Sequence, residues 1–300
     1  MKVMAVVAAG VVLAAVAVGY TVRAADRPAP ETAPGAIAPG LHVRTADGTV
    51  SGTSLSCHRF YAAGDAAVCL AAKPGFPPKT TATVLGRDLT IRHEVEFGGT
   101  PNRARVSPSG RMVSWTVFVS GDSYTASGFS TRTGILDTRT GYLVKNMESI
   151  QLYLDGRRHH APDVNFWGVT FAADDNRFYA TVATGGRTYL VEGDMAAWTA
   201  RTLRANAECP SLSPDGTRIA FKKRVRPGAD DPWRLHVLDL ATLRETPLAE
   251  TRSVDDQAAW LDDRTLAYAL PGPDVWKVPA DGSGAPELLA ADASSPSMAP

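Results

Sequence analysis

The residues able to perform chemistry are few in this 300-residue chain. The sequence has no Gly-x-Ser-x-Gly elbow, no Cys-x-x-Cys pair and no glycine-rich loop opening a helix, so serine hydrolysis, structural zinc and nucleotide cofactors have no support. His159, His160 and Asp163 form the best metal-like cluster. Adjacent residues of a strand point to opposite faces, so these histidines would share an ion only from an irregular loop. The preceding Arg157 and Arg158 favour a solvated loop, and we predict neither a metal site nor a catalytic residue.

The three cysteines fit an oxidising compartment. Cys57 and Cys69 flank a turn at residues 63–65, so they would face each other across a hairpin, where a disulfide is geometrically feasible. Cys209 is left over. We expect it to be a small buried side chain at the start of an inner strand rather than a reactive thiol.

The N-terminus indicates export. Residues 3–20 are apolar or small, as in a secretory signal, and Ala24 ends a small-residue cleavage site. The run is also nearly long enough to span a bilayer, so a cleaved signal and an uncleaved anchor in the cytoplasmic membrane both stay open. We therefore predict a signal peptide or signal anchor over residues 1–24 and an extended proline-rich and alanine-rich linker over residues 25–40. The folded domain is predicted over residues 41–300.

A repeated phrase reveals the elements that position the polar residues. Residues 107–111 (Ser-Pro-Ser-Gly-Arg) and 213–218 (Ser-Pro-Asp-Gly-Thr-Arg) each precede a β-rich run, and weaker copies lie at 172–177 and 261–264. A turn cluster before a strand, recurring every four to six dozen residues, is typical of radial repeats. The clearest repeat holds four strands, which is the blade of a β-propeller. One short helix candidate lies at residues 193–204.

The chain ends suggest how the ring closes. Residues 295–300 (Ser-Pro-Ser-Met-Ala-Pro) echo residues 209–214 (Cys-Pro-Ser-Leu-Ser-Pro), the first strand of a blade. The predicted hairpin at residues 41–55 has no first strand of its own, so joining the two would remove two exposed sheet edges. We predict an all-β propeller of about six four-stranded blades, five full and one composite. An open β-solenoid would leave the C-terminal echo unexplained.

One family resemblance follows from this repeat. Residues 210–221 (Pro-Ser-Leu-Ser-Pro-Asp-Gly-Thr-Arg-Ile-Ala-Phe), followed by residues 233–240 (Trp-Arg-Leu-His-Val-Leu-Asp-Leu), resemble the WD-like repeat of TolB-like propellers, which also occurs in prolyl-oligopeptidase-type peptidases. The resemblance covers residues 41–300. It implies a six-bladed, non-catalytic propeller of the bacterial cell envelope whose central opening binds protein segments. No residues remain for the catalytic α/β domain of the peptidases.

Polar residues at the start of inner strands are the candidate ligand-binding site. In a propeller the first strand of each blade lines the channel, so these residues would rim its mouth. Such a rim could hold a cation through oxygen ligands or receive basic groups of a peptide, although junctions of loops and strands are commonly polar without any function. The candidates are Asp163, Asn165, Asn206, Glu208, Asp255, Asp256 and Gln257.

We predict a non-catalytic, extracytoplasmic, protein-binding scaffold. We expect its partner to be an envelope protein or peptide segment. Only the N-terminal segment would contact a membrane, and the protein would be a monomer. The formal net charge is zero, with 31 basic and 31 acidic residues, which gives no reason to expect nucleic acid. No cofactor is predicted. The alternative is a propeller enzyme or carbohydrate-binding protein that uses a divalent cation in an acidic central funnel.

Overall fold

The computed structural model describes residues 36–120 and 129–300 of the chain. The predicted signal or anchor and most of the predicted linker lie outside these described residues. Within them, the chain forms 24 strands and one short 3-10 turn, η1 (Met147–Ser149). No helix in this described part is long and apolar enough to cross a membrane.

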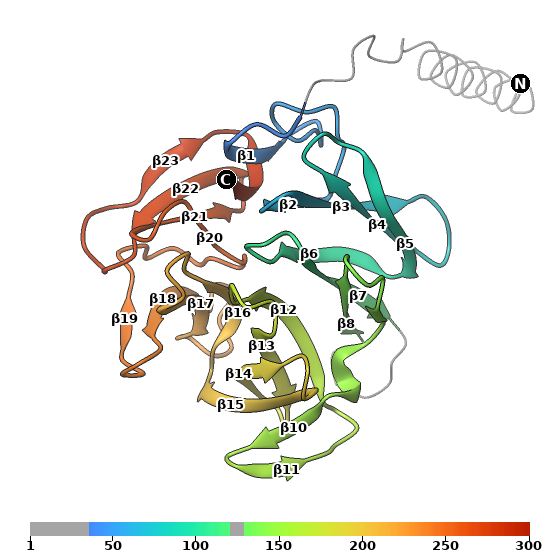
Figure 1. Cartoon of the computed structure of the whole chain (residues 1–300). Coiled ribbons are helices and arrows are strands. Elements are labelled where there is room, and N and C mark those ends of the chain that lie inside the picture. The colour runs from blue at the N-terminus through green and yellow to red at the C-terminus, as the bar shows by residue number, and fades with distance from the viewer. Residues whose placement is uncertain (1–35, 121–128) are drawn as a thin grey trace, which may run out of the picture. The chain divides into compact units, whose positions relative to one another are not determined.

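Five sheets form the blades, four of them with four strands and the third with six (Figure 1). In each blade, four consecutive strands run in chain order from the inner strand outward. This arrangement confirms the predicted all-β propeller. The strands are β2 (Arg59–Ala63), β3 (Ala66–Lys73), β4 (Lys79–Gly86) and β5 (Ile91–Gly98); β6 (Thr100–Val106), β7 (Met112–Ser120), β8 (Phe129–Asp137) and β9 (Leu143–Val144); β12 (Asn165–Phe171), β13 (Arg177–Thr184), β14 (Arg187–Asp194) and β15 (Thr199–Ala205); β16 (Glu208–Leu212), β17 (Arg218–Arg224), β18 (Trp233–Asp239) and β19 (Glu245–Pro247); and β20 (Ala259–Trp260), β21 (Thr265–Leu270), β22 (Asp274–Pro279) and β23 (Glu287–Ala290).

The third blade carries an extra hairpin at its outer edge. Strands β10 (Gln151–Leu154) and β11 (Arg157–His159) pair with each other, and β10 runs parallel to β15. This hairpin falls within the longest interval between repeats. Strands β10 and β11 therefore lie at the outer edge of this sheet, at the opposite edge from its inner strand β12 (Figure 1).

The two ends of the described chain pair with each other, as predicted. Strand β1 (Gly40–Thr45) is antiparallel to β24 (Ala293–Ala299), so the C-terminus lies beside β1 in Figure 1. The closing sheet has only these two strands instead of the predicted four. Residues 50–55 do not form a strand; only isolated bridges, Arg44 to Val50 and Thr49 to Ser56, occur here. A bond from Thr53 N to Val50 O instead turns residues 50–53 back on themselves. The position of the composite sixth blade thus holds a two-stranded sheet.

The repeated phrase forms the turn between the first two strands of a blade. The hydroxyl of Ser213 accepts a bond from Arg218 N (3.0 Å), and Asp215 accepts one from Thr217 N (3.0 Å). Gly216 follows with a φ of 71°, which a residue without Cβ adopts at little cost. Ser107 repeats the first bond to Met112 N (3.0 Å). Local side-chain to backbone bonds therefore determine these turns.

The helix candidate at residues 193–204 is wrong. The chain there completes β14, turns and continues as β15. Asp194 accepts a bond from Ala197 N (2.8 Å), and Trp198 has a φ of 51°, so the backbone reverses instead of coiling. A short polar strand has too little periodicity to be distinguished from a helix in the sequence.

Apolar and aromatic side chains fill the space between blades. Trp115 of β7 stacks on Phe97 of the preceding blade (ring centroids 5.3 Å apart), and Trp260 Nε1 donates to Ser211 O of its neighbour (2.9 Å). Ile37, within the predicted linker, is buried in the same way, and its N–H donates to Arg87 O (2.6 Å). The packed domain thus includes residues immediately before β1.

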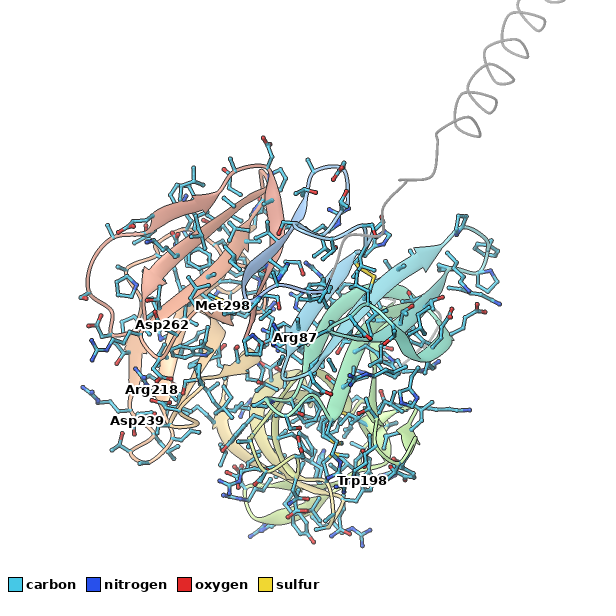
Figure 2. The ribbon with its side chains drawn as sticks, turned by 45° about the horizontal axis from the view of Figure 1, so that its top comes forward. Arg87, Trp198, Arg218, Asp239, Asp262 and Met298 are labelled. Carbon is cyan, nitrogen blue, oxygen red and sulfur yellow. A yellow bond between two sulfur atoms is a disulfide. The ribbon has the colours of Figure 1, made fainter. Side chains whose placement is uncertain are left out.

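A disulfide joins Cys57, just before β2, to Cys69 in β3, with a Cα to Cα distance of 5.4 Å. Its sulfur atoms are yellow in Figure 2. The chain between them makes a hairpin in which Phe60 pairs with Cys69. Cys209 is a free, buried cysteine in β16.

Candidate functional site

A cavity of about 530 Å³ lies where the inner strands of four blades begin. We call it the central cavity. Strand β2 contributes Arg59, β6 contributes Arg103, β12 contributes Trp167, and β16 contributes Glu208. The predicted site residues Asp163, Asn165, Glu208 and Asp255 all line it, so the structure brings four of the seven candidates together.

Two further candidates do not line the central cavity. Asp256 and Gln257 are buried beside a void of about 10 Å³, which Arg103 and Arg105 also border. Gln257 Nε2 donates to Pro210 O (2.7 Å) of the neighbouring blade. Gln257 therefore holds two blades together and does not face the central cavity.

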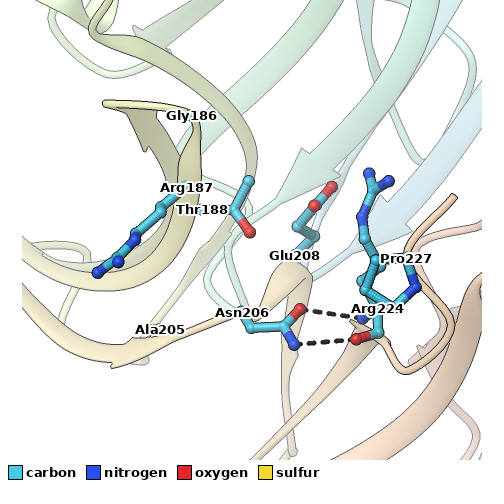
Figure 3. A pocket seen from close by; sticks show the side chains of 8 residues that line it. All are labelled: Gly186, Arg187, Thr188, Ala205, Asn206, Glu208, Arg224 and Pro227. Atoms are coloured by element: carbon cyan, nitrogen blue, oxygen red, sulfur yellow. Dashed lines mark hydrogen bonds between the residues drawn. The ribbon is translucent and has the colours of Figure 1, made fainter.

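Asn206 is separated from the others. It lines an adjacent pocket of about 570 Å³ with Arg187 and Arg224 (Figure 3). Its side-chain amide donates to Arg224 O and accepts from Arg224 N, both at 3.0 Å. Asn206 thus closes the end of the β16–β17 pair. Glu208 borders both this pocket and the central cavity.

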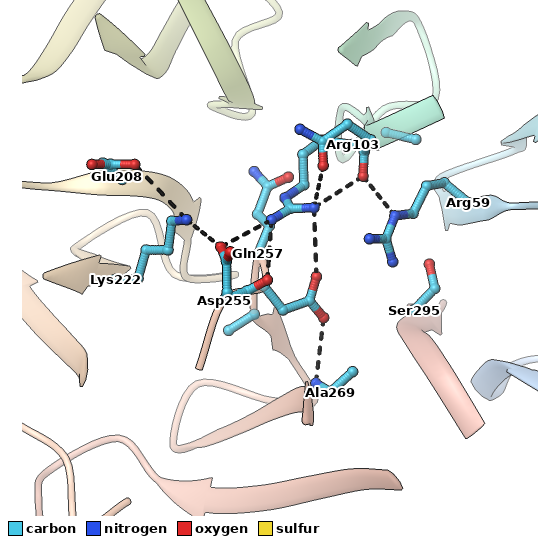
Figure 4. Close-up of polar contacts among 12 residues, drawn as sticks. Arg59, Arg103, Glu208, Lys222, Asp255, Gln257, Ala269 and Ser295 are labelled. Carbon is cyan, nitrogen blue, oxygen red and sulfur yellow. Dashed lines mark hydrogen bonds and ion pairs between the residues drawn. The ribbon is translucent and has the colours of Figure 1, made fainter. Parts of the chain in front are cut away.

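The predicted acidic funnel is instead a mixed-charge site (Figure 4). Lys222 Nζ hydrogen-bonds to Asp255 and lies 3.8 Å from Glu208 Oε2. Arg103 lies 3.8 Å from Asp255 Oδ1 and 4.0 Å from Asp256 Oδ1. Each of these three carboxylates therefore has a cationic neighbour.

The sequence contained a signal for the missed arginines. Arg103 and Arg105 are two residues apart in a strand, so their side chains share one face, and β6 is an inner strand. Arg105 Nη2 donates to Ala258 O (2.7 Å), and its guanidinium lies 4.3 Å from the centre of the Tyr61 ring. Arg105 is therefore a structural residue that links three blades.

Arg59 differs from these buried cations. Its Nε donates to Asn102 O (2.5 Å), which fixes the guanidinium beside the cavity. Among the residues that the structure describes, its two terminal nitrogens have no hydrogen-bond partner, and no carboxylate lies within 4.0 Å. Figure 4 shows this unbonded end of Arg59.

Burial and nearby charges shift the pKa values of two of the cavity carboxylates, Glu208 and Asp255, in opposite directions. Burial raises the pKa of Glu208 above its usual value, and Lys222 and Arg224 only partly offset this. Desolvation also raises the pKa of Asp255, but attraction to Lys222 and Arg103 outweighs it and leaves the pKa below its usual value. At neutral pH, Asp255 is therefore an anion held by its cationic neighbours.

The histidine cluster does not form a metal centre. His159 Nε2 is 2.9 Å from Thr184 Oγ1, and Asp163 accepts bonds from Thr184 Oγ1 (2.9 Å) and Gly185 N (2.6 Å). His160 is exposed beyond them. Across residues 36–120 and 129–300, no three His, Cys, Asp or Glu side chains are placed to hold a metal ion.

Comparisons with known proteins find solved structures with a similar fold. No protein-family model and no curated protein matches this chain. Among solved structures, TolB from Acinetobacter baumannii is similar at a TM-score of 0.59 and 16% identity, over 89% of this chain and 68% of that one. A TolB candidate from Agrobacterium tumefaciens matches at 0.50 and 12% identity, over 83% and 87%. The β-propeller domain of the trilobed protease from Pyrococcus furiosus matches at 0.44 and 10%, over 78% and 70%.

These similarities define the class of the protein as a β-propeller. Its fold resembles that of TolB proteins, in agreement with the repeat at residues 210–221. At such identities the likeness concerns the fold alone.

Proposed function

We propose that this protein is a non-catalytic, extracytoplasmic propeller that binds a segment of another protein in its central cavity. The cavity carries the proposal, because four blades contribute to one opening large enough for several side chains. Its wall combines charged groups with the aromatic side chains of Phe118 and Trp167. Binding sites for peptides typically combine such apolar contacts with a few polar groups that fix orientation.

Two further features support this proposal. At the cavity, Lys222 forms ion pairs with Glu208 and Asp255, and these three side chains do not make the nucleophile and base arrangement of a hydrolase. The disulfide between Cys57 and Cys69 suits an oxidising compartment, which agrees with the export signal predicted at residues 3–20. The resemblance to TolB propellers supports a location in the cell envelope.

Site-specific photo-crosslinking tests the proposal. A photoreactive phenylalanine at Phe118, which is 38% exposed at the cavity, is expected to capture a discrete protein in native envelopes. The matched control is Tyr142, which is 68% exposed in the connection between β8 and β9. Equal capture at both positions, or no adduct at either, would contradict the proposal.

A further inference from the structure

Charge is unevenly distributed around the central cavity. Lys222 and Arg103 are occupied by Asp255, Glu208 and Asp256, whereas Arg59 has only the carbonyl bond of its Nε. Burying a guanidinium without a counter-charge has a desolvation cost, and the binding of an anion beside it would offset that cost. Among the cations of the described cavity wall, Arg59 is therefore the one with spare binding capacity.

The geometry of Arg59 suits a carboxylate. Its Nε donates to Asn102 O, which leaves the two terminal nitrogens of this cavity-lining residue without a hydrogen-bond partner among the described residues (Figure 4). Two parallel N–H donors match the two oxygens of a carboxylate, and such charge-assisted pairs are the stronger class of hydrogen bond. Burial lowers the pKa of Arg59, and nearby Arg103 lowers it further while Asp256 opposes. The surroundings of Arg59 thus favour a negative group.

Resting on the function proposed above, we propose that the central cavity recognises an acidic side chain, Asp or Glu, in the partner segment through the terminal nitrogens of Arg59. Phe118 and Trp167 would contact an apolar residue beside it. A basic side chain would instead meet Arg59 and Arg103. A free C-terminus is usually bound by successive backbone N–H groups, whereas a guanidinium fork suits a side-chain carboxylate.

The probes are capped peptides of one length, acetylated and amidated, with a central Phe flanked by Glu, Gln or Lys. A fourth peptide carries Gln and a free C-terminal carboxylate. Titrated against the full chain by fluorescence anisotropy, the Glu peptide is expected to bind at least about ten-fold more tightly than the others, and less tightly as salt increases.

Variants identify the residue responsible. Arg59→Gln is expected to reduce the affinity for the Glu peptide by roughly ten-fold to a hundred-fold, which is the scale of a charge-assisted hydrogen bond. Arg59→Lys keeps the positive charge but loses the two parallel N–H donors, so its affinity for the Glu peptide should lie between those of the original chain and Arg59→Gln. It also serves as the second variant if Arg59→Gln does not fold. Arg92→Gln is the matched control, because Arg92 pairs with Asp65 on the surface away from the cavity. It should leave binding unchanged.

The possible results test acidic recognition separately from the proposed binding of a protein segment. Equal binding of the Glu, Gln and Lys peptides, or an Arg59→Gln variant that binds Glu normally, overturns acidic recognition but leaves peptide binding intact. Preference for the free carboxylate overturns it in favour of a C-terminus. If no peptide binds but the crosslink at Phe118 succeeds, the inference fails alone; if both fail, both proposals fail.

Discussion

Glu250 shows how a single buried carboxylate stabilises the propeller. It is 2% exposed and accepts bonds from the Tyr268 hydroxyl (2.5 Å) and Arg252 Nη2 (2.6 Å). Arg252 in turn covers the Trp276 ring at 3.9 Å. Burial raises the pKa of Glu250, but the bonds from Arg252 and Tyr268 outweigh it and hold the pKa below its usual value.

This depressed pKa predicts a pH dependence. A carboxyl group whose pKa is lower in the folded than in the unfolded state stabilises the fold above the unfolded pKa, and the contribution is lost as the pH falls through the folded pKa. Glu250→Gln is expected to lower the free energy of unfolding by about 1–3 kcal/mol at pH 7 and by less below pH 4. Denaturant unfolding at both pH values measures this. Glu287→Gln, at an exposed pair with Lys277, should be neutral. A deficit of Glu250→Gln that is unchanged at low pH would contradict the account.

The disulfide makes a second prediction at the residue scale. Cys57 and Cys69 are separated by 12 positions, so a bond between them restricts the unfolded chain and is expected to contribute roughly 3 kcal/mol. Replacing both by Ala should lower the unfolding free energy by about that amount. Mass mapping of unreduced, denatured protein should find Cys209 as the alkylated cysteine. Alkylation of Cys57 and Cys69 without reductant would exclude the bond.

Among the elements, the β1–β24 sheet has the largest predicted effect on stability. Ser297 of β24 is fully buried, and its hydroxyl accepts a bond from Ala62 N of the first blade (2.9 Å). Strand β24 therefore connects β1 to β2 and fills the gap between the last and first blades. Ending the chain at Ser294 should lower stability by several kcal/mol, because it removes this pairing and exposes sheet edges.

Thermal unfolding measures the effect of this truncation. A chain that ends at Ala299 is the matched control, because it retains all of β24 and loses only the exposed Pro300. Its unfolding midpoint should equal that of the full chain. Equal midpoints for the chains ending at Ser294 and Pro300 would show that β24 does not close the ring.

The elements also show what the sequence could predict. The Ser-Pro-Asp-Gly turn depends on bonds within six residues, such as Ser213 to Arg218, so its recurrence located the blades correctly. The pairing of β1 with β24 was predicted because both ends lacked partners. The strand predicted at residues 50–55 was wrong because residues 51–54 are Ser-Gly-Thr-Ser, which are turn-forming types, and the bond from Thr53 N to Val50 O closes a turn there.

For the whole molecule, the axis was the least predictable region. Four predicted polar residues do meet in the central cavity, because the first residues of inner strands converge there. The cations come from three places: Lys222 from a second strand, Arg103 from within the inner strand β6, and Arg59 from the first position of the inner strand β2. Pairing of charges across blades is a tertiary property, so the strand starts selected from the sequence, which did not include Arg59, indicated an acidic site.

The central claim is that a protein segment occupies the central cavity. Hydrogen–deuterium exchange of the full chain, alone and with the protein captured through Phe118, tests it most directly. The account predicts slower exchange in residues 160–164 and 253–258, which lead into inner strands at the cavity, and no change in the outer strands β5, β19 and β23. Protection confined to those outer strands would contradict the claim.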